Sequence, residues 1–155
     1  MGVALSAGPA AAGCFDAPAP GVEWQRCQFD GADLQGHDLT GANLREASFS
    51  RANLSNALLN GADARRAKFV TATLNGVDLE DARLFETDLT KAILTGANLR
   101  GADLRRARFF RTDLRGADLT GAIIDGASFQ NADLSGAIWI DGTKICAEGS
   151  IGKCS

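Results

Sequence analysis

The sequence has no tyrosine, a single histidine and only three prolines, and it contains no long apolar run. Because there is one His, a Ser-His-Asp or Cys-His catalytic set lacks parts, and no enzyme is predicted. No apolar segment approaches the roughly eighteen residues that a helix needs to cross a bilayer, so no transmembrane segment is expected. The net charge of -3 does not favour a simple nucleic-acid binder.

Glycine is abundant instead, with 18 residues in a chain of 155, and its spacing reveals a repeat. Residues 22–141 divide without insertion into 24 five-residue units, such as Ala32-Asp33-Leu34-Gln35-Gly36. We number the positions of each unit one to five. Position one is Ala in 18 units, and position three is Leu in 15 and Phe in 5. A period of five fits no amphipathic helix, and Gly recurring inside helices would cost about 1 kcal/mol each.

Each unit is therefore predicted to be one short extended side followed by a corner. Side chains at positions one and three of an extended segment point to the same face, so they are expected to line a core. Gly occupies position five in 11 units, which suits a corner residue with positive φ. Position two, mostly Asp or Asn, points outward, where these side chains are expected to bond turn backbone rather than form an acid–base pair.

The bulky residues at position three set the length of one circuit. The five phenylalanines at this position are separated by twenty residues or a multiple of twenty, which predicts four sides per coil and about six coils. At about 4.8 Å per coil the column would be roughly 29 Å tall. The expected stack along one inner wall is Phe29, Phe49, Phe69, Leu89, Phe109 and Phe129.

These residues resemble the pentapeptide repeat family, whose signature is A-[D/N]-L-x-x in tandem. The resemblance covers residues 22–141 and persists through all 24 units. It implies an all-β fold, a right-handed quadrilateral β-helix.

A column of stacked coils has two open ends, so caps are expected. Residues 13–21 are interpreted as an N-terminal cap, and residues 142–155 as a C-terminal cap. Residues 1–12 are interpreted as a signal-peptide remnant or a disordered tail. His37, in the first coil, is expected to pack beneath the N-terminal cap rather than to act in catalysis.

All four cysteines lie outside the middle of the column, Cys14 and Cys27 near one end, Cys146 and Cys154 near the other. The height of the column is much more than the Cα spacing of about 4.4–6.8 Å that a disulfide tolerates. Pairing within each end is therefore expected, with four free thiols as the alternative. The same separation argues against a zinc site.

Disulfides are typical of an oxidising compartment. The C-terminal segment also resembles the Cys-bounded endings of exported bacterial pentapeptide repeat proteins. These two features predict a periplasmic or secreted bacterial protein, with a cytoplasmic location as the alternative.

The four sides of the coils, which we call walls one to four in chain order from the unit at Trp24, differ in charge. Walls one and two carry 12 basic and 8 acidic residues, and walls three and four carry 2 and 9. Some members of the resembled family mimic a DNA duplex and act on DNA gyrase, and wall four is the candidate for such mimicry. Its acidic residues are Asp38, Asp78, Glu80, Asp81, Asp118 and Asp141.

Walls one and two carry the remaining candidate surfaces. A ladder of opposite charges is expected at position five of wall one, formed by Arg26, Glu46, Arg66, Glu86 and Arg106. The cations of wall two have fewer acidic neighbours and predict either a solvated face or a polyanion contact; they are Arg51, Lys68, Lys91, Arg108 and Arg111. An outward apolar patch is expected from Val70, Phe85 and Phe110.

The sequence thus favours a non-enzymatic, disulfide-capped scaffold, structural or protein-binding, whose partner no residue pattern names. The alternative is a DNA-mimic regulator of DNA gyrase or another topoisomerase that acts through wall four. No cofactor, metal or small-molecule substrate is expected, and nucleic-acid binding is not favoured. A monomer or weak homodimer is the expected state.

Overall fold

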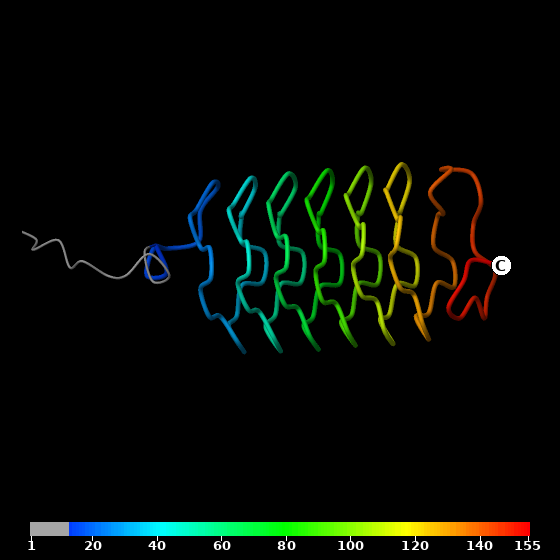
Figure 1. Ribbon diagram of the computed structural model, residues 1–155, viewed down its shortest axis with the longest axis horizontal. Helices are drawn as coiled ribbons and strands as arrows, with labels where there is room; N and C mark the ends of the chain where they lie inside the picture. Colours follow the sequence, from blue (N-terminus) through cyan, green and yellow to red (C-terminus); the bar gives the residue numbers. More distant parts are fainter. Residues whose placement is uncertain (1–12) are drawn as a thin grey trace, which may run out of the picture.

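The backbone of the computed structural model winds into stacked coils (Figure 1), and the structure describes residues 13–155. The interpretation of residues 1–12 lies outside this part of the chain. Within it there is no helix and no continuous strand. Each unit from 22–26 to 137–141 has a single bridge residue at position two, flanked by turns.

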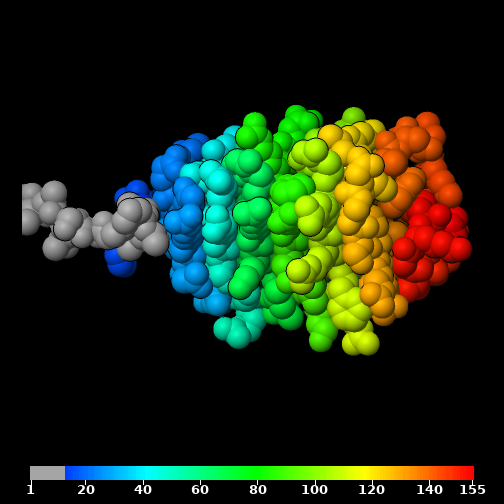
Figure 2. Space-filling model, viewed as in Figure 1, coloured from blue at the N-terminus to red at the C-terminus, as the bar shows by residue number. Residues whose placement is uncertain are grey.

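Parallel bridges join each position-two residue to the one twenty places later, from Glu23 with Asn43 to Asp118 with Ile138. One circuit therefore has twenty residues on four sides, as the phenylalanine spacing predicts. We call residues 22–41 coil 1 and number each following set of twenty up to coil 6, residues 122–141. Figure 2 shows these coils as successive colour bands in close contact.

Positions one and three form the core, as the repeat predicts. In coil 2, Ala42, Leu44, Ala47 and Phe49 are all fully buried. Small and large side chains alternate along each side, so adjacent coils can stack at strand spacing without voids.

Two polar side chains occupy core positions and find partners there. Thr87 stands at position one, and its Oγ1 donates to the Ala64 carbonyl oxygen at 2.8 Å. The Thr112 Oγ1 donates to the Leu89 carbonyl oxygen at 2.7 Å. No buried side-chain nitrogen or oxygen in residues 13–155 lacks a hydrogen-bond partner, so these substitutions for Ala leave no unsatisfied group in the core.

The six expected stack residues lie on one inner wall. The rings of Phe49 and Phe69 stack with centroids 5.1 Å apart, and those of Phe109 and Phe129 at 4.9 Å. Leu89 lies buried between these two ring pairs. Phe129, in coil 6, is only partly buried, because no complete coil covers it.

The corners require positive φ at position five in 23 of the 24 units, whether or not the residue is Gly. Twelve of these residues carry a side chain, among them the β-branched Thr71 at φ 57°. Left-handed backbone costs such residues roughly 1–2 kcal/mol. Stacking on both neighbouring coils therefore imposes a conformation that the local sequence disfavours.

The N-terminal cap lies over the first coil at Trp24. Cys14 is disulfide-bonded to Cys27, and the Trp24 Nε1 donates to the Asp16 carbonyl oxygen at 3.2 Å. Trp24 is only 1% exposed as a result. Gly21 N–H already donates to the Thr40 carbonyl oxygen at 2.8 Å, so the coil geometry begins just before residue 22.

The C-terminal cap folds back along the last coil (Figure 1). Antiparallel bridges join Ile138 to Ile145 and Asp133 to Ile151. A disulfide between Cys146 and Cys154 closes this segment on itself. Both cysteine pairs are those expected from the column's height.

The expectation for His37 is wrong, because its side chain is exposed. The position-one slots of the other coils mostly hold Ala, and an imidazole is too large for such a slot. The cap is held over Trp24 by Cys14 and Asp16 and does not cover His37.

Phe69→Ala should lower the free energy of unfolding by about 3–5 kcal/mol, because it opens a cavity in the ring stack. Urea denaturation with the disulfides intact measures this change. Val70→Ala is the matched control on the outer side of the same unit and should cost less than about 1 kcal/mol. An equal effect of the two substitutions would contradict the buried position of Phe69.

Thr71→Gly should raise the free energy of unfolding by roughly 1 kcal/mol, since Gly adopts φ 57° without the steric cost of a β-branched side chain. Thermal denaturation tests this. Asn56→Gly, at another corner with φ 57°, is the control and should change stability little, because Asn tolerates left-handed backbone. A destabilised Thr71→Gly variant would show that the corner imposes no strain.

Candidate interaction surfaces

Position-two carboxylates and amides are committed to the turns. All twelve Asp and Asn residues at this position accept a hydrogen bond from the N–H two residues later, as Asp88 Oδ1 does from Thr90 at 3.0 Å. The N–H at position four has no backbone partner in the coil, so this side chain satisfies it. The expected role of position two in turn structure is confirmed.

The charge ladder of wall one forms in part. Arg26 pairs with Glu46 at 3.6 Å. Glu86 accepts from Arg66 at 3.1 Å and from Arg106 at 3.0 Å. All of these side chains are substantially solvated, so each pair contributes less than about 1 kcal/mol.

A second set of ion pairs was not foreseen from the sequence. Within one unit, an Arg at position four folds back on the Asp at position two: Arg65 on Asp63, Arg105 on Asp103 and Arg115 on Asp113, each at 2.7 Å. The signal in the sequence is an Asp-x-Arg triplet at positions two to four. In each pair one edge of the guanidinium contacts both carboxylate oxygens, with Nε donating to Oδ1 and Nη2 to Oδ2.

Wall two is the exception to this pairing. Seven of the nine basic residues on the other walls belong to ion pairs, but none is found for the five cations of wall two within residues 13–155. The two carboxylates of this wall are engaged by hydroxyl groups, Asp30 by Ser48 and Asp88 by Thr90. Wall two therefore has a net positive charge, with five cations against two carboxylates, and none of its cations belongs to an ion pair within residues 13–155.

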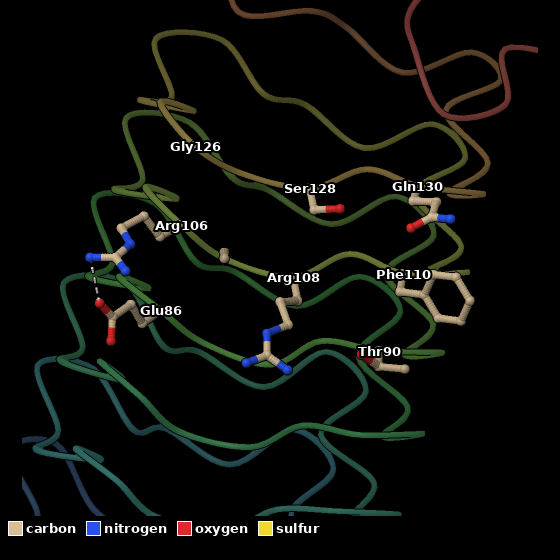
Figure 3. A pocket seen from close by; sticks show the side chains of 9 residues that line it. Glu86, Thr90, Arg106, Arg108, Phe110, Gly126, Ser128 and Gln130 are labelled. Atoms are coloured by element: carbon tan, nitrogen blue, oxygen red, sulfur yellow. Dashed lines mark ion pairs between the residues drawn. The ribbon is translucent and has the colours of Figure 1, made fainter.

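A shallow groove of about 860 Å³ lies over coils 4 to 6 of wall two (Figure 3). The Glu86–Arg106 pair forms one rim and Phe110 the other, while Arg108 projects between them. The floor near coil 6 includes Gly126 and Ser128, and Thr90, Ala107 and Gln130 complete the lining. The groove offers guanidinium and hydroxyl donors beside an aromatic ring.

The apolar patch expected from Val70, Phe85 and Phe110 is split. Phe110 lines the groove of wall two, with the Arg111 guanidinium 5.2 Å from its ring centroid. Phe85 lines two other hollows, on wall one, with Arg105 and Arg106 each 5.7 Å from its ring. The corner formed by the wall-one ladder separates the two rings.

The six acidic residues of wall four do not form one continuous column. Position two runs Asp38, Leu58, Asp78, Asn98, Asp118 along successive coils, so at this position carboxylates occur only on alternate coils. The other three acidic residues stand at positions four and five: Glu80, Asp81 and Asp141. Leu58 is 41% exposed between two of them. Hydrogen bonds from the Thr40 side chain and backbone hold the pKa of Asp38 below its ordinary value.

Asp118 is the one acidic residue of wall four with an ion-pair partner in the described chain. Arg100 reaches its Oδ2 at 3.1 Å. Burial raises the pKa of Asp118, but hydrogen bonds from Thr120 and Arg100 outweigh this and lower it overall. The wall is acidic but partly neutralised.

Metal-ligand clusters and membrane-spanning helices are both absent from residues 13–155. No group of three His, Cys, Asp or Glu side chains comes together as a metal site. In the same residues no helix is long and apolar enough to cross a membrane.

Comparison with known families gives one match that extends through the coils. The chain matches the family described as pentapeptide repeats, in eight copies, over residues 19–46, 25–61, 47–84, 82–121 and 102–138. No curated protein matches the sequence of the chain.

Solved structures of similar proteins have the same repeat. HetL, a pentapeptide repeat protein involved in heterocyst differentiation regulation in the cyanobacterium Nostoc, is 30% identical with a TM-score of 0.55, over 79% of this chain and 70% of that one. A pentapeptide repeat protein from the cyanobacterium Cyanothece is 25% identical with a TM-score of 0.64, over 76% and 90%. One from the thylakoid lumen of Arabidopsis thaliana is 26% identical with a TM-score of 0.50, over 81% and 85%.

Asp103→Asn should make the protein less sensitive to acid. The side-chain hydrogen bond from Arg105 lowers the pKa of Asp103, against burial, which raises it. A lowered folded-state pKa stabilises the protein at pH values above the unfolded-state pKa of about 3.9. This stabilisation is lost as pH falls through the folded-state pKa. The fall in Tm between pH 7 and pH 3 should therefore be smaller in this variant than in the unsubstituted protein.

Asp33→Asn is the control for this measurement, because Asp33 also stands at position two and accepts from the N–H two residues later, at Gln35, but makes no ion pair within residues 13–155. Its fall in Tm should equal that of the unsubstituted protein. If Asp103→Asn also behaved like the unsubstituted protein, the Asp103–Arg105 pair would contribute nothing to acid stability.

Proposed function

The chain belongs to the pentapeptide repeat family, whose members form right-handed quadrilateral β-helices, and we propose that it is a non-enzymatic scaffold that binds a protein partner through wall two. The observation that carries this proposal is the selective absence of ion pairs there. The other walls neutralise most of their cations with carboxylates one coil or two residues away.

Unneutralised cations on one face favour an anionic partner, because complementary charge steers association and excludes other partners. Phe110 and the partly buried Val70 lie on the same wall as these cations and add apolar contact. Aromatic and Arg side chains together are typical of residues that dominate protein interfaces. The coils behind them supply a rigid, preformed backbone.

We also propose that the protein works in an oxidising compartment, the periplasm or the cell exterior. Both cysteine pairs lie at bonding distance, and such bonds persist only where thiols are not kept reduced. Thiol titration of fractionated cells tests this: the protein should be found outside the cytoplasm with no reactive thiol. Four reactive thiols in cytoplasmic protein would refute it.

Photo-cross-linking in the native host tests wall two as the binding face. A benzoylphenylalanine residue at Thr90, at position four of wall two, should give a discrete protein adduct, because this site lies in the groove. The matched control is the same residue at Thr95, at position four of wall three in the same coil, which should give none. Equal adducts from both positions, or none from Thr90, would contradict a wall-two interface.

The DNA-mimic function remains the second candidate, and the excess of acidic residues on wall four supports it. A cross-linker at Glu80, on wall four, distinguishes the two. Adducts of gyrase subunits at this position, together with inhibition of DNA supercoiling by the purified protein, would favour mimicry over the wall-two scaffold.

A further inference from the structure

The backbone hydrogen bonds between coils follow one rule on every wall. The N–H groups at positions three and five donate to carbonyls of the next coil, as Leu104 does to Ile123 at 2.8 Å. The N–H at position two donates back to the carbonyl at position one of the preceding coil, as Ile123 does to Ala102 at 3.0 Å. A coil without a successor therefore leaves two N–H donors and one carbonyl acceptor unpaired on each wall.

The C-terminal cap supplies the missing coil on walls three and four. Leu134 N–H donates to Ser150, Gly136 N–H to Cys146 and Trp139 N–H to Lys144, each at 2.8 Å. The Cys146 N–H in turn donates to the Ala137 carbonyl oxygen at 2.8 Å. This half of the end is closed.

Walls one and two of coil 6 have no such hydrogen-bonded cover within residues 13–155, although Gly152 of the cap lies against the corner at Asn131, where a Cβ would be 3.7 Å from the Asn131 nitrogen. No acceptor in residues 13–155 takes the N–H groups of Ile124, Gly126, Phe129 and Asn131, and no donor there reaches the carbonyls of Ala122 and Ala127. The side chains agree: Ile124, Ala127 and Phe129 are only partly buried, whereas their counterparts in coil 5 are fully buried. These groups form an open β-edge, which we call the C-terminal edge.

The free main-chain groups of the C-terminal edge are mostly donors. They are four N–H groups and two carbonyls, so the partial charge of this backbone edge is positive, and its one acidic side chain is the exposed Asp125 on wall one. Immediately below it in coil 5 stand Arg108 and Arg111, neither of which has an ion pair in the described chain. The groove of wall two also opens onto this edge, since Gly126, Ser128 and Gln130 belong to both.

We propose that the C-terminal edge, residues 122–131, binds an extended acidic segment of a partner polypeptide as an added strand. Its carbonyls accept from the four free N–H groups, and its apolar side chains cover Ile124 and Phe129. Its outward carboxylates reach Arg108 and Arg111. Strand addition of this kind draws affinity from main-chain bonds and specificity from side chains. The proposal rests on the proposed protein-binding function and names the edge and the partner's chemistry.

A second copy of the chain fits this edge poorly. Two C-terminal edges present the same donor excess and the same cations to each other. The complementary carbonyl-rich edge is on coil 1, where the N-terminal cap blocks wall one: a side chain at Gly13 would overlap the Glu23 carbonyl oxygen. The Cys14–Cys27 disulfide fixes this cap in place. The geometry therefore favours a different polypeptide.

An NMR titration of the intact, oxidised protein tests the proposal directly. The probe is the peptide acetyl-Ala-Asp-Leu-Asp-Gly-Ala-Asp-Phe-Glu-Gly-amide, which has the repeat pattern of two walls. We expect the largest amide shifts, and slower hydrogen exchange, at Ile124, Gly126, Phe129 and Asn131, with Leu134 unchanged because its N–H is already bonded. The same peptide with Asn and Gln in place of its acidic residues should bind about tenfold more weakly.

Two charge-reversal pairs separate the edge from the rest of wall two. Arg108→Glu with Arg111→Glu should weaken the acidic peptide at least tenfold, and Arg51→Glu with Lys68→Glu should leave its affinity within about twofold. All four side chains are exposed and outside ion pairs in the described residues, so both variants should fold.

Three results would overturn the proposal. Shifts spread evenly along wall two, or equal weakening by both charge-reversal pairs, would mean that the peptide binds the wall and not the edge. Absence of shifts at millimolar peptide would mean that no strand is accepted. Slowed exchange at the edge with rising protein concentration and no peptide, matched by a dimer in sedimentation, would assign the edge to a second copy. A wall-two cross-link at Thr90 alongside any of these results would leave the scaffold proposal intact.

Discussion

The fold depends on one constraint, the return of the chain to the same wall after every twenty residues. Each coil bonds to the next through N–H groups at positions three and five, as in Phe49 to Lys68 at 2.7 Å and Arg51 to Val70 at 2.9 Å. An inserted or deleted residue would shift every later side chain to the wrong face. The constraint is strong enough to hold twelve residues other than Gly at positive φ.

The same register determines the electrostatics of the surface. A side chain at a given position meets the residues twenty places before and after it, and position two meets position four of its own unit. Charges placed at these intervals therefore pair, as Arg66 does with Glu86 and Arg105 with Asp103. Arg51, Lys91 and Arg111 stay unpaired because no carboxylate stands at either interval. Arg108 stands one coil above Asp88, which accepts from Thr90 and makes no ion pair within residues 13–155. Wall two is distinguished by this pattern rather than by its number of cations.

The sequence predicts most of this architecture because the same residue pattern recurs in each five-residue unit. The period, the inward positions, the ring stack and the cysteine pairing all follow from spacing and column height. The predictions that fail concern individual side chains rather than the repeat itself. His37 faces solvent because its slot suits Ala, and Phe85 and Phe110 are separated by a corner whose width the spacing does not reveal. The Asp-x-Arg pairs form within one unit, two residues apart, so the stacking of neighbouring coils does not reveal them.

The least predictable feature is the asymmetry of the two ends, and it follows from the direction of the inter-coil bonds. On each wall the first coil offers two carbonyls for every N–H, and the last coil offers two N–H groups for every carbonyl, so the column is polar along its axis. On walls three and four, the C-terminal cap provides acceptors for these N–H groups, namely the carbonyl oxygens of Lys144, Cys146 and Ser150. On walls one and two, no residue of the described chain provides a carbonyl acceptor for the free N–H groups of coil 6. A partner there has to bring acceptors, and the exposed Arg108 and Arg111 favour one whose side chains are acidic as well.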